Sequence, residues 1–365
     1  MWSSAGSQRA LMDRPHIPGI WLALCCLLLA GCAASTGSAS ARYHFPACAS
    51  TIGPACAVGT GATHLQVFVE PDDGVRPITD AIRAAQRSIL VEVYILSDTT
   101  VITALEDAAN RGLDVRVMLE PHPYESSPVT VQSTLEKLKA AGIKVNETNP
   151  IFQLTHAKFL LLDGTTLFLL TANLSHAALG GTPQVTNREY LLEDSEIADV
   201  NEAQTIFTAD WTRATPTLSD PNLLASPINA RVKLLALIAS AKTTIQIENE
   251  EMQDIQLEDA LAQAAWRGVS IQVVLPAPAG GQDSNAAGVA LLRKAGISVR
   301  YDTQYYMHAK LMLIDQTRAY VGSENISTAS LDDNRELGLI VADPATLNTL
   351  ATTFRSDYAT SQMYS

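Results

Sequence analysis

The chain has 365 residues, 47% of them hydrophobic, and 38 acidic side chains against 25 lysines and arginines give a formal net charge of −13. An acidic surface repels phosphate polymers, so this balance weighs against a general nuclease, although a local basic cleft is compatible with a negative total. The length is sufficient for two ordinary domains or for one duplicated domain.

The N-terminus has the pattern of an export signal. Arg9 and Arg14 precede an apolar stretch at 20–30 that is too short for a comfortable membrane span. Leu-Ala-Gly-Cys follows at 29–32 and resembles a bacterial lipobox, which predicts residues 1–31 as a lipoprotein signal peptide and Cys32 as the lipidated first residue. Ordinary signal cleavage nearby is the alternative. The expected location is the bacterial cell envelope, where a lipid anchor holds the exported chain at the outer membrane or the periplasmic face.

Residues 32–62 are predicted to form a flexible tether, because Ala, Ser, Thr and Gly dominate there and apolar periodicity is weak. Cys48 and Cys56 are the only cysteines after Cys32. In an oxidising compartment the two are able to close a small disulfide loop, and two free thiols are the alternative. Nothing in the sequence indicates a metal site or a cofactor.

After the tether, the same order of predicted elements occurs twice. In the first copy, strands at 88–94 and 112–119 flank a helix at 102–111. In the second copy, strands at 244–247 and 269–275 flank a segment with helical spacing. Strands that alternate with helices predict a mixed sheet covered by helices on both faces, that is, an α/β fold built as a duplicated α-β-α sandwich.

The boundary between the two copies is predicted at a segment rich in Pro, Thr and Ser over 215–221. The first half therefore covers residues 63–220 and the second half covers residues 221–365. A further predicted helix in each half ends in a similar sequence, Lys-Ala-Ala-Gly-Ile at 139–143 and Arg-Lys-Ala-Gly-Ile at 293–297, just before the strand that leads to a histidine.

A short motif with identical spacing follows in each half. Its residues are His156, Lys158, Asp163 and Asn173 in the first copy, and His308, Lys310, Asp315 and Asn325 in the second. Residues two apart on a strand point to the same face, so each histidine is expected to project together with its lysine. The duplication predicts one site in which the two histidines face each other.

The Asp-Gly pair at 163–164 is a strong signal for a hairpin turn. A two-residue turn pairs Leu162 with Thr165 and His156 with Thr171. The returning strand is then expected to bring Thr171 and the following Asn to the face that carries the histidine.

Equivalent spacing places Ser323 and Asn325 beside His308 in the second half. We expect the hydroxyls of Thr171 and Ser323 to bind substrate. Asp163 has the opposite parity to the histidine and lies at the turn, so we expect it and its counterpart in the second half, Asp315, to be structural. These two carboxylates are predicted to stabilise the hairpins through bonds to the backbone.

The sequence Asn-Arg-Glu also occurs twice, at 187–189 and at 334–336. In a strand, the Asn and the Glu of each copy share one face. A carboxylate beside a histidine fixes its tautomer and supports the imidazolium form, so we assign this role to Glu189 and Glu336.

The doubled motif resembles the signature H-x-K-x4-D-x6-G-S-x-N of the phospholipase D superfamily. The second copy matches at every position, whereas the first has Leu170-Thr171 where Gly-Ser is usual, which keeps a hydroxyl but places a larger side chain against the phosphate pocket. The resemblance extends from about residue 63 to the end of the chain. It implies two phospholipase D-like halves related by a pseudo-twofold axis.

The resemblance also implies a phosphodiesterase that needs no metal or cofactor. One neutral imidazole attacks phosphorus to give a phosphohistidine, and the other histidine protonates the leaving alcohol and then activates water. Family behaviour implies His156 as the nucleophile, held by Glu336, and His308 as the acid and base, held by Glu189. The departure at Leu170-Thr171 leaves the order of the two histidines open. The groups expected around the phosphate are Lys158, Lys310, Asn173 and Asn325.

Three functions fit this sequence. The first is a phospholipase D that cleaves a glycerophospholipid to phosphatidate and a free headgroup, or transfers the phosphatidyl group to an alcohol. A nuclease of the same family is the alternative, and the charge disfavours it. A non-catalytic envelope protein is the third, and the complete set of His, Lys, Asn and Glu argues against it. The expected partners are a phospholipid and, through the lipid anchor, a membrane surface, but not nucleic acid. Because both motifs lie in one chain, we expect a monomer.

Overall fold

The computed structural model describes residues 56–124, 126–182, 186–278 and 282–363. The predicted signal peptide, Cys32 and residues 32–55 of the predicted tether lie outside these ranges. Cys56 is disulfide-bonded, whereas Cys48, its predicted partner, lies outside the described residues. No helix within the described ranges combines the length and the hydropathy that a membrane span requires.

The first half is built on a mixed sheet in the order β1-β7-β6-β5-β2-β3-β4. Strands β2, β3 and β4 run parallel to one another, and the remaining neighbours are antiparallel. Its strands are β1 (Leu65–Glu70), β2 (Ser88–Val93), β3 (Asp114–Leu119), β4 (Lys144–Glu147), β5 (Lys158–Leu162), β6 (Thr166–Leu170) and β7 (Asn187–Asp194). Its outer helices are α1 (Arg76–Ala84), α2 (Thr99–Asn110) and α3 (Pro128–Ala140).

The second half repeats this arrangement in the order β8-β17-β15-β14-β9-β11-β12. Its strands are β8 (Leu223–Ser226), β9 (Thr244–Glu248), β11 (Ser270–Pro276), β12 (Ser298–Asp302), β14 (Leu311–Ile314), β15 (Arg318–Gly322) and β17 (Glu336–Val341). Its helices are α5 (Ala230–Ser240), α6 (Ile255–Trp266), α7 (Ala286–Lys294) and α8 (Thr328–Asp332). Two strands of two residues, β10 (Met252–Gln253) and β16 (Ile326–Ser327), pair with each other. The predicted duplicated α/β fold with mixed sheets is confirmed.

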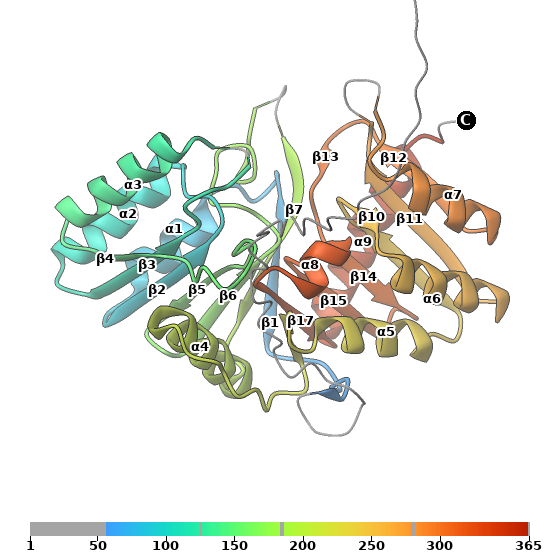
Figure 1. Cartoon of the computed structure of the whole chain (residues 1–365), viewed down its shortest axis with the longest axis horizontal. Helices are drawn as coiled ribbons and strands as arrows, with labels where there is room; N and C mark the ends of the chain where they lie inside the picture. Colours follow the sequence, from blue (N-terminus) through green and yellow to red (C-terminus); the bar gives the residue numbers. More distant parts are fainter. Residues whose placement is uncertain (1–55, 125, 183–185, 279–281, 364–365) are drawn as a thin grey trace, which may run out of the picture. The chain divides into compact units, whose positions relative to one another are not determined.

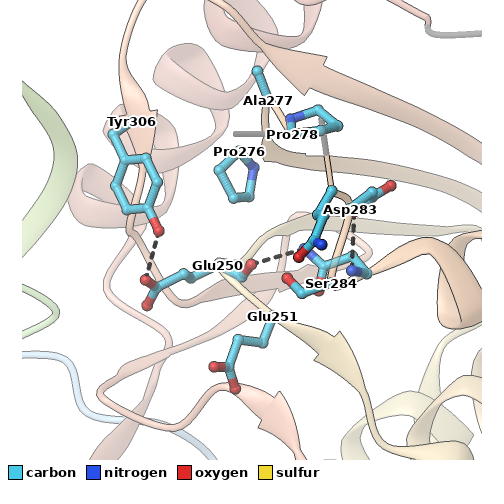
Figure 2. A pocket seen from close by; sticks show the side chains of 10 residues that line it. Glu250, Glu251, Pro276, Ala277, Pro278, Asp283, Ser284 and Tyr306 are labelled. Atoms are coloured by element: carbon cyan, nitrogen blue, oxygen red, sulfur yellow. Dashed lines mark hydrogen bonds between the residues drawn. The ribbon is translucent and has the colours of Figure 1, made fainter. Parts of the chain in front are cut away.

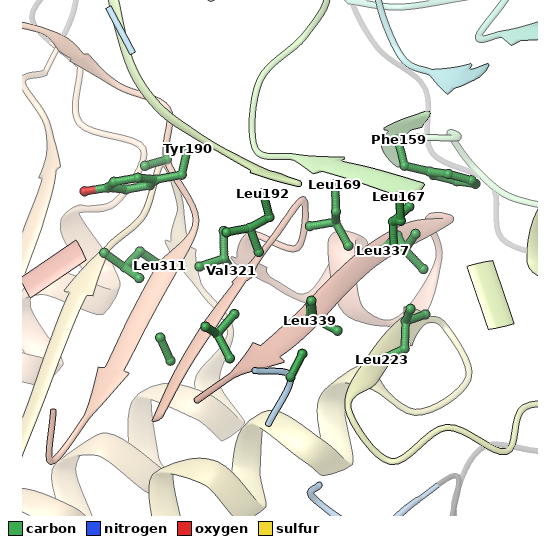
Figure 3. Packing of buried hydrophobic residues seen from close by; sticks show 14 of the residues in the cluster. Phe159, Leu167, Leu169, Tyr190, Leu192, Leu223, Leu311, Val321, Leu337 and Leu339 are labelled. Atoms are coloured by element: carbon green, nitrogen blue, oxygen red, sulfur yellow. The ribbon is translucent and has the colours of Figure 1, made fainter. Parts of the chain in front are cut away.

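Both halves belong to one compact unit, and their sheets share a hydrophobic core. In Figure 1, α1 to α3 lie beside the first sheet and α5 to α7 beside the second, with the two sheets between them. Figure 3 shows leucines of the two sheets pointing toward one another, among them Leu169, Leu192, Leu337 and Leu339. Helices α4 (Ile197–Thr212) and α9 (Pro344–Thr360) also pack against this shared core.

Strand β6 explains why the sequence here is apolar without alternation. Leu167 and Leu169 enter the core between the sheets, whereas Phe168 and Leu170 enter the core beneath the outer helices. Successive side chains of a strand point to opposite faces, so a strand that is buried on both faces needs a continuous apolar run.

The halves exchange backbone contacts at the segments that carry the histidines. Strand β13 (Tyr306–Met307), just before His308, pairs with the start of β7 in the first half. Reciprocally, the amides of His156 and Ala157 donate to the carbonyl oxygen of Arg335 at the start of β17, at 2.8 and 2.9 Å. Each histidine segment therefore lies beside the Asn-Arg-Glu strand of the other half, as a twofold relation between the halves requires.

The hairpin between β5 and β6 differs by one residue from the predicted register. Leu162 pairs with Thr166, not with Thr165, so the loop has three residues. Asp163 adopts a positive φ of 57°, which Asp tolerates and which suits a longer hairpin loop. Strand β5 begins at Lys158, so the predicted pairing of His156 with Thr171 is wrong. The backbone of His156 is bonded to the other half instead.

Candidate active site

Each motif histidine lies against a carboxylate of the opposite half. His156 Nδ1 is 2.9 Å from Glu336 Oε2, and His308 Nδ1 is 2.6 Å from Glu189 Oε1. Both carboxylates are fully buried, and the histidine side chains retain exposures of only 12% and 4%. Because Nδ1 of each ring is occupied by a carboxylate, Nε2 is the nitrogen that is left for chemistry.

The two motif lysines fold back onto the backbone of their own histidines. Lys158 Nζ donates to the carbonyl oxygen of His156 at 2.5 Å, and Lys310 Nζ donates to that of His308 at 2.6 Å. Both lysines are almost completely buried. Buried ammonium groups are costly unless opposite charges compensate them, and Glu189 and Glu336 supply negative charge within the same site.

Burial sets the ionisation of the first motif. It lowers the pKa of His156 to about 4, an effect that Glu336 opposes and Lys158 reinforces, so the imidazole is neutral near pH 7. Burial likewise lowers the pKa of Lys158 to about 7. Burial alone would raise the pKa of Glu336, but the adjacent His156 and Lys158 outweigh it and keep the carboxylate ionised.

Hydroxyl and amide groups brace the two carboxylates from behind. Thr171 Oγ1 donates to Glu189 at 2.6 Å, and Asn187 Nδ2 donates to the same carboxylate at 3.1 Å. In the second half, Ser330 donates to Glu336 at 2.6 Å. Ser330 lies outside the motif, in α8, and has no counterpart in the first motif. Only the three-dimensional structure reveals this residue.

Thr171 and Ser323, which the sequence predicts to bind substrate, form hydrogen bonds within the protein. Both side chains are fully buried. Besides its bond to Glu189, the Thr171 hydroxyl accepts from the amide of Tyr190 at 2.9 Å. The Ser323 hydroxyl accepts from the amide of Leu337 at 3.0 Å. These hydroxyls tie neighbouring strands together and, in the first half, hold a carboxylate.

The motif asparagines are buried but differ in their contacts. Asn325 Nδ2 lies 3.3 Å from Glu250 Oε2. Within the described residues, the Oδ1 atoms of Asn173 and Asn325 have no hydrogen-bond partner. The asparagines therefore retain unused hydrogen-bonding capacity close to the histidines.

The motif aspartates lie at the hairpin loops and bond to backbone outside them. Asp163 accepts from three successive amides, those of Gln86, Arg87 and Ser88, at 2.6 to 2.9 Å. Asp315 accepts from the three equivalent amides, those of residues 242–244, at 2.8 to 2.9 Å. Each aspartate thus ties its hairpin to the loop before the adjacent strand, not to the hairpin's own backbone.

Comparison with known proteins agrees with this geometry. The family model described as "Cardiolipin synthase, PLD-like domain" matches residues 78–211 and 234–358. The chain belongs to the phospholipase D superfamily. This family comprises phosphodiesterase-type enzymes, and the two matched segments correspond to the two halves of the structure.

Two curated relatives of the phospholipase D family are cardiolipin synthases. Cardiolipin synthase 1 of Bacillus anthracis is 24% identical over 345 residues, a match that covers 81% of this chain and 66% of the relative's length. The minor cardiolipin synthase ClsB of Bacillus subtilis is also 24% identical, with 80% of each chain covered. The chain thus spans 66% of the length of the first relative. Phosphatidylserine synthase of Haemophilus influenzae shares the fold, with a TM-score of 0.62 at 11% identity, covering 82% of this chain and 88% of that chain.

The departure from the phospholipase D signature at Leu170 is a matter of core packing. In the second half Gly322 faces Gly338 across the sheet, and a Cβ on Gly322 would lie 2.5 Å from the Cα of Gly338. The buried side chains of Tyr320 and Glu324 occupy the space that these glycines leave. In the first half Leu170 is a fully buried core residue. The expectation that it lies against a phosphate pocket is therefore corrected.

Glu250, two residues after the end of β9, belongs to this phospholipase D site although the sequence motif does not include it. Its Oε2 lies 2.9 Å from Lys310 Nζ and 3.4 Å from His308 Nε2. The matching strand registers place it where Tyr94 stands in the first half. Tyr94 instead packs its ring edge-on against His156, with 4.8 Å between centroids. A direct alignment of the two halves would have revealed this substitution.

Proposed function

We propose that the protein is a phospholipase D-type enzyme that cleaves a phosphodiester bond of a glycerophospholipid and passes the phosphatidyl group to water or to an alcohol. The pair of reciprocal His–Glu contacts, with a buried lysine beside each histidine, is the observation that carries this proposal. The lipid substrate is supported by the names of the relatives, which are cardiolipin synthases.

The first step forms a covalent intermediate at His156. Its Nε2 lone pair attacks phosphorus, the bond from phosphorus to the headgroup oxygen breaks, and His308 gives its Nε2 proton to the departing alkoxide. A neutral His156 is needed for this attack, and the lowered pKa of about 4 provides one at neutral pH. The negative charge of a bound phosphate favours the protonated form of Lys158, and the ammonium groups of Lys158 and Lys310 then offset the negative charge on the phosphoryl oxygens.

The second step returns the enzyme to its starting state. Water or an acceptor alcohol attacks the phosphohistidine, its proton passes to His308, and the bond between phosphorus and nitrogen breaks. The imidazolium form of His308 is stabilised by Glu189, whose carboxylate is held ionised by the neighbouring positive charges. Proton uptake and release by His308 therefore balance over the cycle.

One pair of assays tests the reaction and the substrate together. The mature protein is incubated in a chelator with phosphatidylcholine vesicles and ethanol and, in parallel, with single- and double-stranded DNA. We expect phosphatidylethanol and free choline from the vesicles. Cleavage of DNA with intact lipid would replace the proposed lipid substrate by a nucleic acid and make the protein a nuclease of the same family.

The assignment of the nucleophile has its own test. A phospholipid labelled at phosphorus is mixed with the enzyme, which is then quenched and assayed for acid-labile, base-stable protein-bound label. We expect the label to be absent in His156→Ala and, when the labelled substrate carries a p-nitrophenyl leaving group that needs no protonation, present in His308→Ala. Steady-state turnover of a natural phospholipid should be reduced at least about 10³-fold in both variants. Label that persists in His156→Ala but disappears in His308→Ala would reverse the two roles.

We also propose that the chain is exported and acylated at Cys32, supported by the Leu-Ala-Gly-Cys sequence after an apolar run. Mass spectrometry of the mature N-terminus should show an acylated cysteine, and Cys32→Ala should release the protein from the membrane fraction. An unmodified N-terminus at another position would contradict the anchor.

A further inference from the structure

Glu250 contacts three of the groups that the proposed mechanism directs at phosphate. Its Oε2 accepts from Lys310 Nζ at 2.9 Å, lies 3.3 Å from Asn325 Nδ2, and lies 3.4 Å from His308 Nε2. Three donors from different parts of the second half thus converge on one carboxylate oxygen. Such convergence is the geometry in which a phosphate oxygen is bound.

The carboxylate carries a full negative charge in this position. Burial alone would raise the pKa of Glu250, but the charges of His308 and Lys310 lower it far below its ordinary value. The side chain is only 16% exposed, so water screens the interaction weakly. A phosphate oxygen and this carboxylate oxygen cannot occupy the same three donors at once.

We propose that Glu250 is an internal ligand of the phosphate-binding groups, which it holds in place in the empty site and gives up to the incoming phosphate. This proposal rests on the proposed function, because it takes Lys310, Asn325 and His308 as the phosphate-binding groups. It makes Glu250 a residue that determines which anions the site accepts.

The structure provides room for the displaced carboxylate. Glu250 lines a pocket of about 640 Å³, and Figure 2 shows its side chain extending toward Tyr306 on one wall of that pocket. The Tyr306 hydroxyl donates to the other oxygen, Oε1, at 2.9 Å. Rotation about the side-chain bonds can therefore move Oε2 away from Lys310 while Oε1 keeps its contact with Tyr306.

A carboxylate at this position discriminates between ligands by charge. A phosphodiester carries one negative charge, whereas a phosphomonoester such as phosphatidate or inorganic phosphate carries nearly two at neutral pH. Electrostatic repulsion grows in proportion to the charge of the ligand, so Glu250 opposes the binding of the monoester more strongly. The residue therefore favours binding of the substrate over retention of the hydrolytic product.

The first half has no carboxylate at the position of Glu250, because the equivalent residue is Tyr94. Its ring packs against His156 and lies 5.3 Å from Lys158 Nζ, so it offers these groups an aromatic face and no formal charge. The discrimination is therefore expected to depend on the second half alone.

Binding of small anions to the intact protein tests the proposal without turnover. Titration calorimetry at pH 7.5 compares inorganic phosphate, which is mostly a dianion, with dimethyl phosphate, which is a monoanion. In Glu250→Gln we expect the Kd of inorganic phosphate to fall about tenfold or more and that of dimethyl phosphate to fall less. Glu250→Asp, which retains the charge, should bind inorganic phosphate more weakly than Glu250→Gln.

A matched control separates a specific contact from a general change of charge. Glu251→Gln removes the same charge from a residue that lines the same pocket, and we expect it to change the phosphate Kd much less. An unchanged or raised phosphate Kd in Glu250→Gln, with thermal unfolding like that of the parent, would overturn the internal ligand. Equal gains for the two anions would overturn the discrimination by charge. Failure of lipid cleavage would instead contradict the proposed function, because these isotherms need no reaction.

Discussion

The two halves share one strand order but place their histidines in different surroundings. In the first half Tyr94 packs against His156, whereas in the second half the equivalent Glu250 contacts His308 and Lys310. Burial disfavours the charged form of the His156 imidazole, whereas a carboxylate beside an imidazole favours its charged form. The difference therefore fits a division of labour in which one histidine attacks phosphorus and the other transfers protons.

The ion pairs that join the two halves are the same in both, and they fix how the halves pack against each other. Each Arg of the repeated Asn-Arg-Glu sequence is buried and pairs with an Asp of a helix in the opposite half, Arg188 with Asp357 and Arg335 with Asp210. The duplication has thus preserved the groups that hold the halves together. The charges around the histidines have diverged.

The largest expected effects come from the carboxylates that hold the histidines. Glu336→Gln and Glu189→Gln should each reduce turnover of a natural phospholipid by about 10² to 10⁴, because a neutral amide fixes the tautomer poorly and stabilises no positive charge. The two variants should differ with a p-nitrophenyl leaving group, which needs no protonation. We expect that substrate to restore the first step in Glu189→Gln but not in Glu336→Gln.

The size of the p-nitrophenol burst measures this difference, and the parent enzyme with both substrates is the control. If the p-nitrophenyl substrate restored the first step equally in both variants, the two histidines would not have separate roles as nucleophile and proton donor. Restoration in Glu336→Gln alone would exchange the roles of the two histidines.

Much of this site could be predicted because a duplication shows itself in one sequence. The repeated motif identified His156, Lys158 and their counterparts. The Asn-Arg-Glu repeat identified the two glutamates, and the phospholipase D resemblance supplied the pairing across halves that the structure now shows. The alternation of side chains along a strand was sufficient to predict which of these residues share a face, because strand periodicity is a local property.

The remaining features depend on local geometry or contacts that no repeated motif marks. Ser330 reaches Glu336, six residues later in the chain, because α8 holds its hydroxyl beside the start of β17, and no repeated motif indicates this contact. The predicted hairpin register was wrong by one residue. The Asp-Gly pair predicts a two-residue loop, whereas the loop includes a third residue. Glu250 lies outside the repeated motif, two residues after β9, and only a comparison of β9 with β2 through the residues that follow them would align it with Tyr94.

A second prediction concerns the packing difference at the end of the hairpin. Leu170→Ala removes a fully buried side chain and should lower the free energy of unfolding by about 2–5 kcal/mol. Gly322→Ala adds a methyl group whose carbon would lie 2.5 Å from the Cα of Gly338 and 2.7 Å from both the Tyr320 hydroxyl oxygen and Glu324 Oε2. The overpacking should cost about 1–3 kcal/mol.

Urea denaturation followed by circular dichroism measures both changes. Ala172→Gly, two residues after the end of β6, serves as a control for altered backbone freedom without loss of a large side chain. A Gly322→Ala variant as stable as the parent would show that the backbone at Gly338 and the side chains of Tyr320 and Glu324 can all shift, and that the glycine is not required for packing.

The smallest effects are expected where the halves are alike, at the hairpin aspartates. Asp163→Asn and Asp315→Asn each weaken three bonds from backbone amides, because an amide oxygen is a poorer acceptor than a carboxylate and its NH₂ group cannot accept. Each should lower the free energy of unfolding by about 1–2 kcal/mol and leave turnover nearly unchanged. Because the two hairpins lie in separate halves and share no partner, the double variant should show the sum of the two losses. A turnover loss in either variant without a loss of stability would place that aspartate in the reaction, and unequal stability losses would extend the asymmetry of the halves to their outer loops.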